Sequence, residues 1–309
     1  MKKISVLMPC YNCAEFITET LNSILNQTLK TDDYEIIIID DGSTDDSVHI
    51  IQSLIANYEN VFFLPRKKNL GIIKTRNELL NLAKGRSELI AWCDADDVYH
   101  SNKLLGQYNY IKSRNLIGCG TWYKKFGVQN RSIIKFINPA ANRVFSIFGT
   151  PVGFPTFMHK NNLDIFFDES LESSEDYDFV AKVCQLGDVG NFPKFYTYYR
   201  THIKQESTKH LCRQKRAHIS ISKKIFKEYY SADLSAQNWI DFPRVSTIDE
   251  TKAILQMQKV YCERNNIIFN AIIDYRFIVF NKNKMSCLFY YLAARNIKLL
   301  NICMLFKGK

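Results

Sequence analysis

Short apolar runs alternate with helix-period segments along the first 120 residues. Ile4–Met8, Glu35–Ile39, Val61–Leu64 and Leu89–Cys93 have the length of strands. Glu35–Ile39 contains four isoleucines and is too apolar to be exposed on either face, as in a parallel sheet. Strands alternating with helices predict a parallel sheet with right-handed crossovers. The helices that we expect among these strands cover residues 16–25, 43–57, 71–84 and 102–114.

The pattern changes after residue 120 and again after residue 205. Residues 121–136 predict two antiparallel strands, followed by a short helix, a loop, a helix and a strand over 139–148, 149–155, 174–186 and 192–201. From about residue 206 only helical spacing remains, over 219–230, 248–265 and 285–306. We therefore expect an α/β domain over residues 1–205 and a helical, basic region over residues 206–309.

Composition excludes several classes of protein. Hydrophobic residues make up 46% of the 309, enough for a large core and too many for a disordered chain. The sequence contains no run of 18 or more uncharged apolar residues, so we expect no membrane-spanning helix. The apolar run Ile4–Met8 is too short for the core of a signal peptide. Nine cysteines at irregular spacings do not form a disulfide framework and indicate a reducing compartment. We interpret the tight pair Cys10 and Cys13 as coincidental, because no second pair or nearby histidine completes a zinc site.

The net charge of +10 is concentrated in the last third of the chain. Residues 1–200 hold 22 basic and 23 acidic residues, whereas residues 201–309 hold 19 and 8. Such asymmetry predicts contact with nucleic acid or anionic lipid. We find no nucleic-acid-binding motif in residues 201–309, so we expect no nucleic-acid partner. The basic helix over 285–306 predicts either an interfacial anchor or a helix that packs its apolar side on the α/β domain, and the charge favours the first.

Three carboxylates follow the strand at Leu89–Cys93, namely Asp94, Asp96 and Asp97. The carboxyl ends of strands are where open α/β sheets bind ligands. Two aspartates one residue apart can hold one Mg²⁺ or Mn²⁺ ion, which such sites usually share with a phosphate. An isolated pair of this kind is more often an acidic turn before a helix, so its neighbours decide its meaning.

Four further motifs appear in a fixed order around these carboxylates. They are Met8–Asn12 after the first strand, Ile39–Ser43 after the second, Asn69–Gly71 with Arg76, and Glu175–Asp178 followed by Tyr199–His202. Together they resemble the family 2 glycosyltransferases over roughly residues 1–207. The resemblance implies the α/β GT-A fold, a Rossmann-like and mostly parallel sheet, with a helical basic C-terminal extension. It also implies an inverting reaction on a nucleotide-sugar.

The resemblance places a uridine nucleotide on the turns after the first two strands. Tyr11 would stack on the uracil, Asp41 would accept its ring N–H, and Pro9 would shape the loop. Alternatively, Asp41 caps the following helix. Arg76 would pin Asp96 and Asp97 or bridge the diphosphate, or else lie on a solvated helix face.

The same resemblance assigns the metal and the rest of the donor site. Asp94 and Asp97 would contact the donor's ribose and diphosphate. Asp96, Asp94 and His202 would bind Mn²⁺ or Mg²⁺, with Asp96 as the first candidate for a direct ligand. His202 could equally be a plain surface histidine.

Asp176 matches the general base of the family, which takes the proton of the acceptor hydroxyl. Asp178 is the second candidate and could instead be a first-turn acid of the helix. The family often carries an arginine shortly after this motif, where this chain has Lys182. Lys182 could take the place of this arginine, but a lysine is not equivalent to an arginine at a bidentate site, so the resemblance defines the base better than the acceptor contacts.

We therefore expect a metal-dependent glycosyltransferase that moves a hexosyl or N-acetylhexosaminyl group from a UDP-sugar to a glycan or lipid-linked saccharide. Its role would be in cell-surface polysaccharide or lipooligosaccharide synthesis, in the cytoplasm or on the inner membrane face. Two alternatives stay open. A nucleotidyltransferase would need a Gly-rich basic loop after the first strand, which this chain lacks, and only an assay would exclude an inactive homologue.

Overall fold

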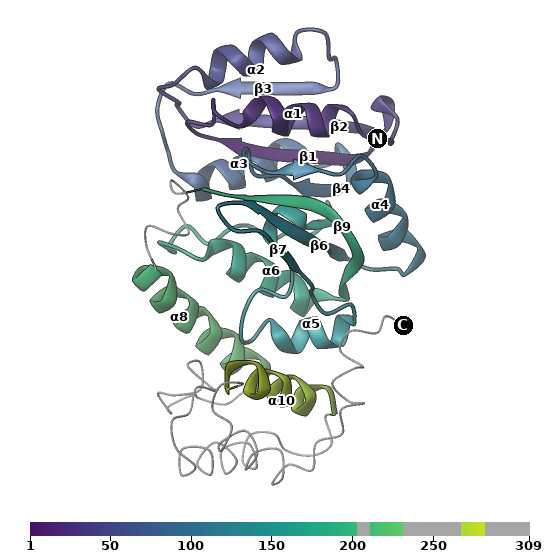
Figure 1. Cartoon of the computed structure of the whole chain (residues 1–309), viewed down its shortest axis with the longest axis vertical. Helices are drawn as coiled ribbons and strands as arrows, with labels where there is room; N and C mark the ends of the chain where they lie inside the picture. Colours follow the sequence, from purple (N-terminus) through teal and green to yellow (C-terminus); the bar gives the residue numbers. More distant parts are fainter. Residues whose placement is uncertain (203–210, 231–266, 282–309) are drawn as a thin grey trace.

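The computed structural model describes residues 1–202, 211–230 and 267–281, and its centre is one nine-stranded sheet (Figure 1). The strand order is β3-β2-β1-β4-β8-β6-β9-β5, with β7 paired to β6. The first four strands are parallel, as the sequence predicts. They are β1 (Lys2–Cys10), β2 (Tyr34–Asp40), β3 (Val61–Pro65) and β4 (Ser87–Trp92).

Helices cover both faces of this parallel half. Alternate residues of β1 supply both cores: Ile4, Val6 and Met8 pack with α1, α2 and α4, and Leu7 packs with α3 and α6. The sheet is therefore doubly wound, and the predicted α/β class is confirmed. The helices are α1 (Ile17–Leu25), α2 (Ser47–Ile55), α3 (Ile72–Ala83), α4 (Lys103–Ser113) and α6 (Glu175–Leu186), with a 3₁₀ turn, η1 (Thr31–Asp33), before β2.

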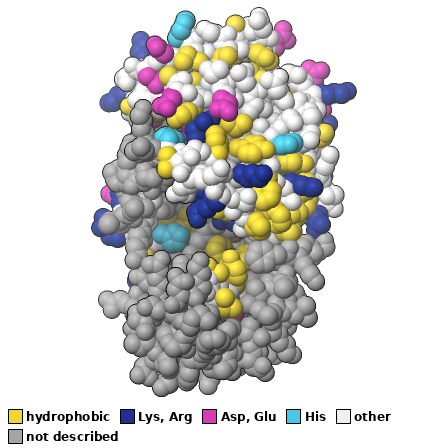
Figure 2. All heavy atoms as spheres, in the orientation of Figure 1, with side chains coloured by type: hydrophobic (Ala, Val, Ile, Leu, Met, Phe, Trp, Pro, Cys, Tyr) yellow, Lys and Arg dark blue, Asp and Glu magenta, His cyan; other side chains and the backbone are white. Residues whose placement is uncertain are grey.

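The second half of the sheet is mixed. β6 (Gly118–Gly127) pairs antiparallel with β7 (Arg131–Ile133), which confirms the two antiparallel strands predicted over 121–136. β6 also runs parallel to β9 (Val189–Thr201). The short strands β5 (Val98–Tyr99) and β8 (Met158–Lys160), together with η2 (Phe154–Thr156), were not predicted. Lys and Arg side chains lie among hydrophobic ones over the region of β6 and β7 in the view of Figure 2.

A third core joins the C-terminal helices to the sheet domain. α8 (Leu211–Tyr230) and α10 (Ile267–Asn281) pack against α5 (Pro139–Phe145) and α6. Phe148, Ile221 and Ile272 are among the buried residues of this core. No helix within the described ranges is long and apolar enough to span a membrane. The helices expected over 248–265 and 285–306 lie outside the described residues, so the membrane-anchor interpretation stays a prediction.

The buried side chain of His159 gives the fold a pH-dependent stability. Its Nε2 accepts a hydrogen bond from Trp92 Nε1 at 3.1 Å, and the ring is only 2% exposed. Burial lowers the pKa of His159 to about 4, so the native state keeps it neutral. The unfolded chain protonates this histidine below about pH 6.5, so stability falls as the pH drops from about 6.5 towards 4.

Urea unfolding at several pH values tests this prediction. We expect His159 to contribute a loss of about 2 kcal/mol between pH 7 and pH 5. His159→Gln, which keeps an acceptor for Trp92 but does not titrate, should lose correspondingly less over the same interval. An identical pH dependence in both proteins would contradict the assignment.

Candidate active site

The carboxyl ends of β1, β2 and β4 meet at one edge of the sheet. Cys10 pairs with Asp40, and Leu7 pairs with Trp92 in the parallel register. The turns after these strands therefore lie side by side, because parallel neighbours end at the same edge. Tyr11, Asp41 and Asp94 all follow within two residues of a strand end.

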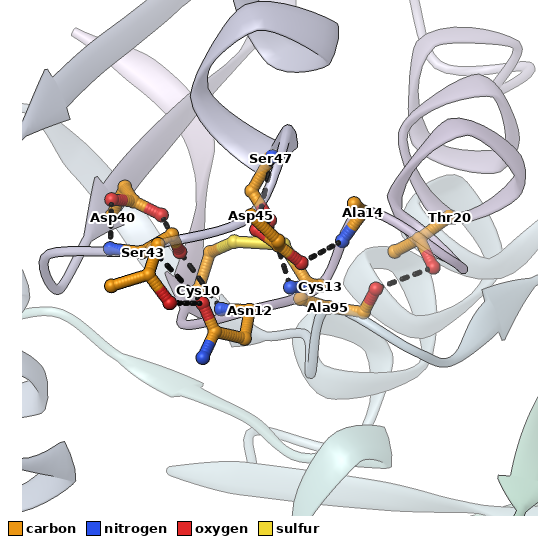
Figure 3. The surroundings of a disulfide bond; sticks show 11 residues. Cys10, Asn12, Cys13, Ala14, Thr20, Asp40, Ser43, Asp45, Ser47 and Ala95 are labelled. Carbon is orange, nitrogen blue, oxygen red and sulfur yellow. Dashed lines mark hydrogen bonds between the residues drawn. A yellow bond between two sulfur atoms is a disulfide. The ribbon is translucent and has the colours of Figure 1, made fainter.

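The turn after β1 presents Tyr11 to solvent. Its side chain is 50% exposed, whereas the flanking Cys10 and Cys13 are buried and joined by a disulfide (Figure 3). The chain reverses at Asn12, which has a φ of 49°, so the two cysteines come within 6.2 Å between Cα atoms. The interpretation of this pair as coincidental is therefore wrong. Three other cysteines in the described part of the chain are free and buried: Cys93, Cys119 and Cys184.

Side chains from the β2–α2 connection hold this turn in place (Figure 3). Cys13 N–H donates to Ser47 Oγ at 2.8 Å, and Ala14 N–H donates to Asp45 Oδ2 at 3.1 Å. Asp45 also accepts the N–H of Ser47 at 3.0 Å. α2 begins at Ser47, with Asp46 before it as an N-cap that makes no side-chain cap hydrogen bond, and not near residue 43 as predicted.

The side chain of Asp41 is buried and accepts hydrogen bonds from three donors. The N–H groups of Leu70 and Gly71 lie 3.0 and 2.8 Å from its two oxygens, and Arg66 Nη1 lies 2.8 Å away. The side-chain hydrogen bonds of Asp41 therefore reach the segment between β3 and α3 and not α2, against the helix-cap alternative. We did not predict a role for Arg66 from the sequence. Its position as a basic residue directly after β3 is the signal that could have identified it. A carboxylate has about four acceptor positions, so Asp41 keeps capacity for a ring N–H.

Arg76 of α3 links the edge of β4 to the start of α6. Its Nη1 lies 2.7 Å from Glu175 Oε1, and its Nη2 lies 3.4 Å from Asp94 Oδ1. The guanidinium carbon lies 4.4 Å from the ring centroid of Phe154, and Arg76 is 6% exposed. Arg76 is thus not a solvated residue, and its carboxylate partners are Asp94 and Glu175, not the predicted Asp96 and Asp97. Its Nε is buried without a partner among the described residues.

The acidic motif after β4 divides into two environments. Asp94 and Asp96 are partly exposed, and burial together with their mutual repulsion raises the pKa of Asp94 to about 6, against the attraction of Arg76. Asp97 is 1% exposed and accepts the N–H of Arg200 at 2.8 Å, and burial raises its pKa well above the usual range. A donor-binding role for Asp97 stays a prediction, because this side chain faces the interior.

His202 lies beside Asp96, as expected of a residue that closes over the same site. Its Nε2 is 3.0 Å from Asp96 Oδ2, and its ring centroid is 4.9 Å from that of Phe16. Its Nδ1 is buried with no partner among the residues that the structure describes. His202 is therefore a partly buried residue of the site and not a plain surface histidine.

The carboxylates fit a divalent cation that is shared with a phosphate. Asp94 and Asp96 repel each other at one edge, which a cation would relieve, and Mg²⁺-type sites commonly use one or two carboxylates plus substrate phosphates. Within residues 1–202, 211–230 and 267–281 no three His, Cys, Asp or Glu side chains form a ready metal cluster. His202 Nε2 does lie 3.0 Å from Asp96 Oδ2, and a metal-binding role for Asp94, Asp96 and His202 stays a prediction.

Asp176 is the second residue of α6, next to the Glu175 that pairs with Arg76. Burial and the Glu175 charge raise the pKa of Asp176, against the attraction of Arg76, and its Oδ1 accepts the N–H of Tyr177 at 2.8 Å. The charge of Asp176 contributes to the raised pKa of Asp94, so the two carboxylates lie within electrostatic range of each other. Asp178 instead is 2% exposed and lies 2.6 Å from Lys182 Nζ. The structure therefore excludes Asp178 as an accessible base and gives Lys182 an internal partner.

Comparison with known proteins identifies related sequences. Residues 5–167 match the model of glycosyl transferase family 2. A poly(ribitol-phosphate) beta-glucosyltransferase of Bacillus spizizenii is 30% identical over 273 residues, which cover 85% of this chain and 40% of that protein. A poly(ribitol-phosphate) beta-N-acetylglucosaminyltransferase of Staphylococcus aureus is 40% identical over 149 residues, or 46% of this chain and 42% of that protein. The chain thus spans less than half the length of these relatives.

Solved structures share the fold over almost the whole chain. A fragment of S. aureus TarS in complex with UDP-GlcNAc has a TM-score of 0.59 at 18% identity and covers 95% of this chain and 90% of its own. A mannosyltransferase of Pyrobaculum calidifontis in complex with GDP-Man and Mn²⁺ has a TM-score of 0.57 at 14% identity, over 95% and 86% of the two chains. At these identities the likeness establishes the fold, as the sequence predicted.

Proposed function

Because the chain belongs to glycosyl transferase family 2, we propose that it is an inverting, metal-dependent transferase that uses a UDP-sugar. The observation that carries the proposal is that Arg76 bridges the partly exposed Asp94 after β4 and Glu175 at the start of α6, next to Asp176. Asp94 and Asp96 suit a metal-bound nucleotide diphosphate, and Asp176 suits an acceptor hydroxyl. Our division at residue 205 between a catalytic and a helical region belongs to the same proposal.

The turn after β1 and the buried Asp41 would hold the uracil. Tyr11 offers an exposed ring for stacking, and the disulfide-linked turn around it is tied to α2. Asp41 would accept the ring N–H, held in place by Arg66, Leu70 and Gly71. The curated relatives transfer glucosyl and N-acetylglucosaminyl groups by name, and a TarS fragment is bound to UDP-GlcNAc, which supports a UDP-hexose or UDP-N-acetylhexosamine donor.

Asp96 and Asp94 would hold Mn²⁺ or Mg²⁺ together with the donor diphosphate, and His202 would close over them. Such an ion supplies charge neutralisation for the leaving diphosphate. Arg76 would keep Asp94 ionised and correctly oriented, because its guanidinium is fixed between Asp94, Glu175 and the ring of Phe154.

Asp176 would act as the general base. Its carboxylate takes the proton of the acceptor hydroxyl while that oxygen attacks the anomeric carbon from the side opposite the leaving UDP, which inverts the configuration. Burial and the adjacent Glu175 make Asp176 a stronger base than a solvated aspartate, because they raise its pKa. The hydrogen bond from Tyr177 N–H fixes the orientation of one oxygen of this carboxylate.

The acceptor would be a hydroxyl of a glycan or a lipid-linked saccharide in the synthesis of cell-surface polymers. Two curated relatives act on poly(ribitol-phosphate), which supports a cell-surface acceptor. A cytoplasmic location, on the inner membrane face through the basic residues after 201, is part of the proposal and is supported by the charge asymmetry alone.

Release of UDP tests the proposal. We expect the protein with Mn²⁺ to release UDP slowly from at least one UDP-sugar, by transfer to water, and faster once an acceptor is supplied. The released nucleoside diphosphate is measured chromatographically, and we expect no GDP release from any GDP-sugar. Release from GDP-sugars alone would overturn the donor assignment, and no release from any nucleotide-sugar would indicate an inactive homologue.

A further inference from the structure

Two basic residues share one face of β6 and β7, and a third, Lys135, follows two residues after the end of β7. Lys125 of β6 lies directly opposite Arg131 of β7 in the antiparallel pair, so their side chains share one face. The Nζ of Lys135 donates a hydrogen bond to the backbone oxygen of Thr150 at 2.9 Å. Burial lowers the pKa of Lys135 to about 8, and its charge is attracted by Asp176 and repelled by Lys125. Lys135 is therefore within electrostatic range of both Lys125 and Asp176.

This arrangement is costly for the protein alone. Like charges directly opposite on neighbouring strands destabilise a sheet, and after burial the repulsion of Arg131 lowers the pKa of Lys125 further. None of Lys125, Arg131 and Lys135 forms an ion pair with a carboxylate in the part of the chain that the structure describes. An anionic ligand would relieve the repulsion and use all three charges.

Aromatic rings lie beside the three cations. Lys125 Nζ is 5.3 Å from the ring centroid of Tyr199, and the rings of Tyr199 and Tyr123 are 6.0 Å apart. Tyr123 is two residues before Lys125 and so points to the same face of β6. Burial raises the pKa of Tyr123, and the charges of Arg131 and Asp97 act on it in opposite directions, so both groups lie within electrostatic range of this ring. Flat rings next to cations suit the carbon skeleton of a sugar or polyol that carries an anionic group.

We propose that Lys125, Arg131 and Lys135 form a subsite for a phosphate group of the acceptor, close to the hydroxyl that Asp176 deprotonates. The inference rests on the proposed function, because it assigns the acceptor side of the same reaction. Phosphate matches the site because two or three cations, including the planar fork of Arg131, can share its oxygens. The acceptor is then a phosphate-bearing saccharide, polyol or lipid-linked glycan, and not a neutral glycan.

Lys124 provides a matched control. It is the neighbour of Lys125 on β6, but it points to the opposite face, where its Nζ lies 5.5 Å from the ring centroid of Phe195. Lys124→Gln removes the same charge from the same strand as Lys125→Gln. A ligand that merely responds to net charge therefore loses the same affinity in both variants, whereas a ligand of the subsite does not.

The test is calorimetric titration of glycerol 3-phosphate into the full chain, with and without saturating UDP and Mn²⁺. We expect Lys125→Gln, which removes one charge as Lys124→Gln does, to bind this probe at least about threefold more weakly than the wild type. The double variant Lys125→Gln/Arg131→Gln should bind about tenfold more weakly or worse, because it loses two charge-assisted contacts. Lys124→Gln should bind within about twofold of the wild type, and glycerol should not bind. Sedimentation with vesicles distinguishes a lipid-linked phosphate from a soluble one. For a lipid-linked phosphate, we expect the protein to bind phosphatidylglycerol vesicles but not phosphatidylcholine vesicles, and this binding should be lost when Lys125 and Arg131 are replaced.

Equal weakening in Lys124→Gln and the double variant would overturn the subsite. So would a wild-type protein that binds UDP but neither glycerol 3-phosphate nor phosphatidylglycerol vesicles. Binding of either probe that depends on Lys125 and Arg131 in a protein that fails to bind UDP would support the subsite and contradict the donor assignment. The two proposals therefore fail separately.

Discussion

Asp176→Asn is expected to lower the turnover number about 1,000-fold while leaving UDP affinity unchanged. A general base typically contributes 10²- to 10⁴-fold, and an amide at this position cannot take the proton of the acceptor hydroxyl. The substitution keeps the shape and the hydrogen bond from Tyr177 N–H, so the fold should survive. Steady-state rates of UDP release with acceptor, together with UDP titration, separate the chemical step from donor binding.

Asp178→Asn is the matched control, two residues along the same helix. Asp178 is buried and pairs with Lys182, so this variant should lose stability but keep turnover within a few-fold. If Asp176→Asn retained more than about a tenth of the wild-type turnover, the base would have to be another residue.

Arg76→Met is expected to destabilise the protein by about 3 kcal/mol and to abolish transfer. The substitution removes the guanidinium that lies 2.7 Å from Glu175 and 3.4 Å from Asp94, and it leaves two partly buried carboxylates without their counter-charge. Methionine fills much of the same volume, so the loss reports on charge and not on a cavity. Arg76→Lys should be intermediate, because one ammonium group cannot bridge both partners.

Two further variants make this measurement specific. Lys74→Met changes an exposed lysine on the same helix and should alter the free energy of unfolding by less than about 0.5 kcal/mol. Glu175→Gln in the Arg76→Met background should recover part of the loss, because it neutralises one of the unpaired carboxylates. Urea denaturation of the four proteins gives the free energies. An Arg76→Met variant as stable as the wild type would contradict the bridging role.

The parts of the site that sequence predicts are those fixed by local pattern. The apolar runs before Tyr11, Asp41 and Asp94 identify parallel strands, and the carboxyl ends of parallel strands must meet at one edge. The position of Asp96 beside His202 also follows from motif order, although the two are far apart in the chain. The resemblance to family 2 added the roles, and the fold is confirmed.

The parts that sequence could not predict depend on contacts between distant segments. Arg76 and Glu175 are 99 residues apart, and nothing in either motif specifies their ion pair. Asp176 and Asp178 are both acids in the first turn of α6, but residues two apart on a helix point in very different directions. Only the packed structure shows that Asp178 faces inward.

Short elements and side-chain chemistry account for the remaining differences. β5 has two residues and β8 has three, too few for any apolar period to appear. The bond between Cys10 and Cys13 depends on the reversal at Asn12, a residue in a left-handed conformation that its identity permits but does not require. The basic residues of β6 and β7 appear in the sequence as ordinary surface charges, until the strand register places Lys125 opposite Arg131.

The measurement that tests the central claim most directly is calorimetric titration of UDP, with and without Mn²⁺, into the wild type and Asp96→Ala. We expect UDP to bind when Mn²⁺ is present, to bind much more weakly without it, and to lose this dependence in the variant, because the metal is shared by the carboxylates and the diphosphate. A folded wild-type protein that does not bind UDP in the presence of Mn²⁺ would contradict the account.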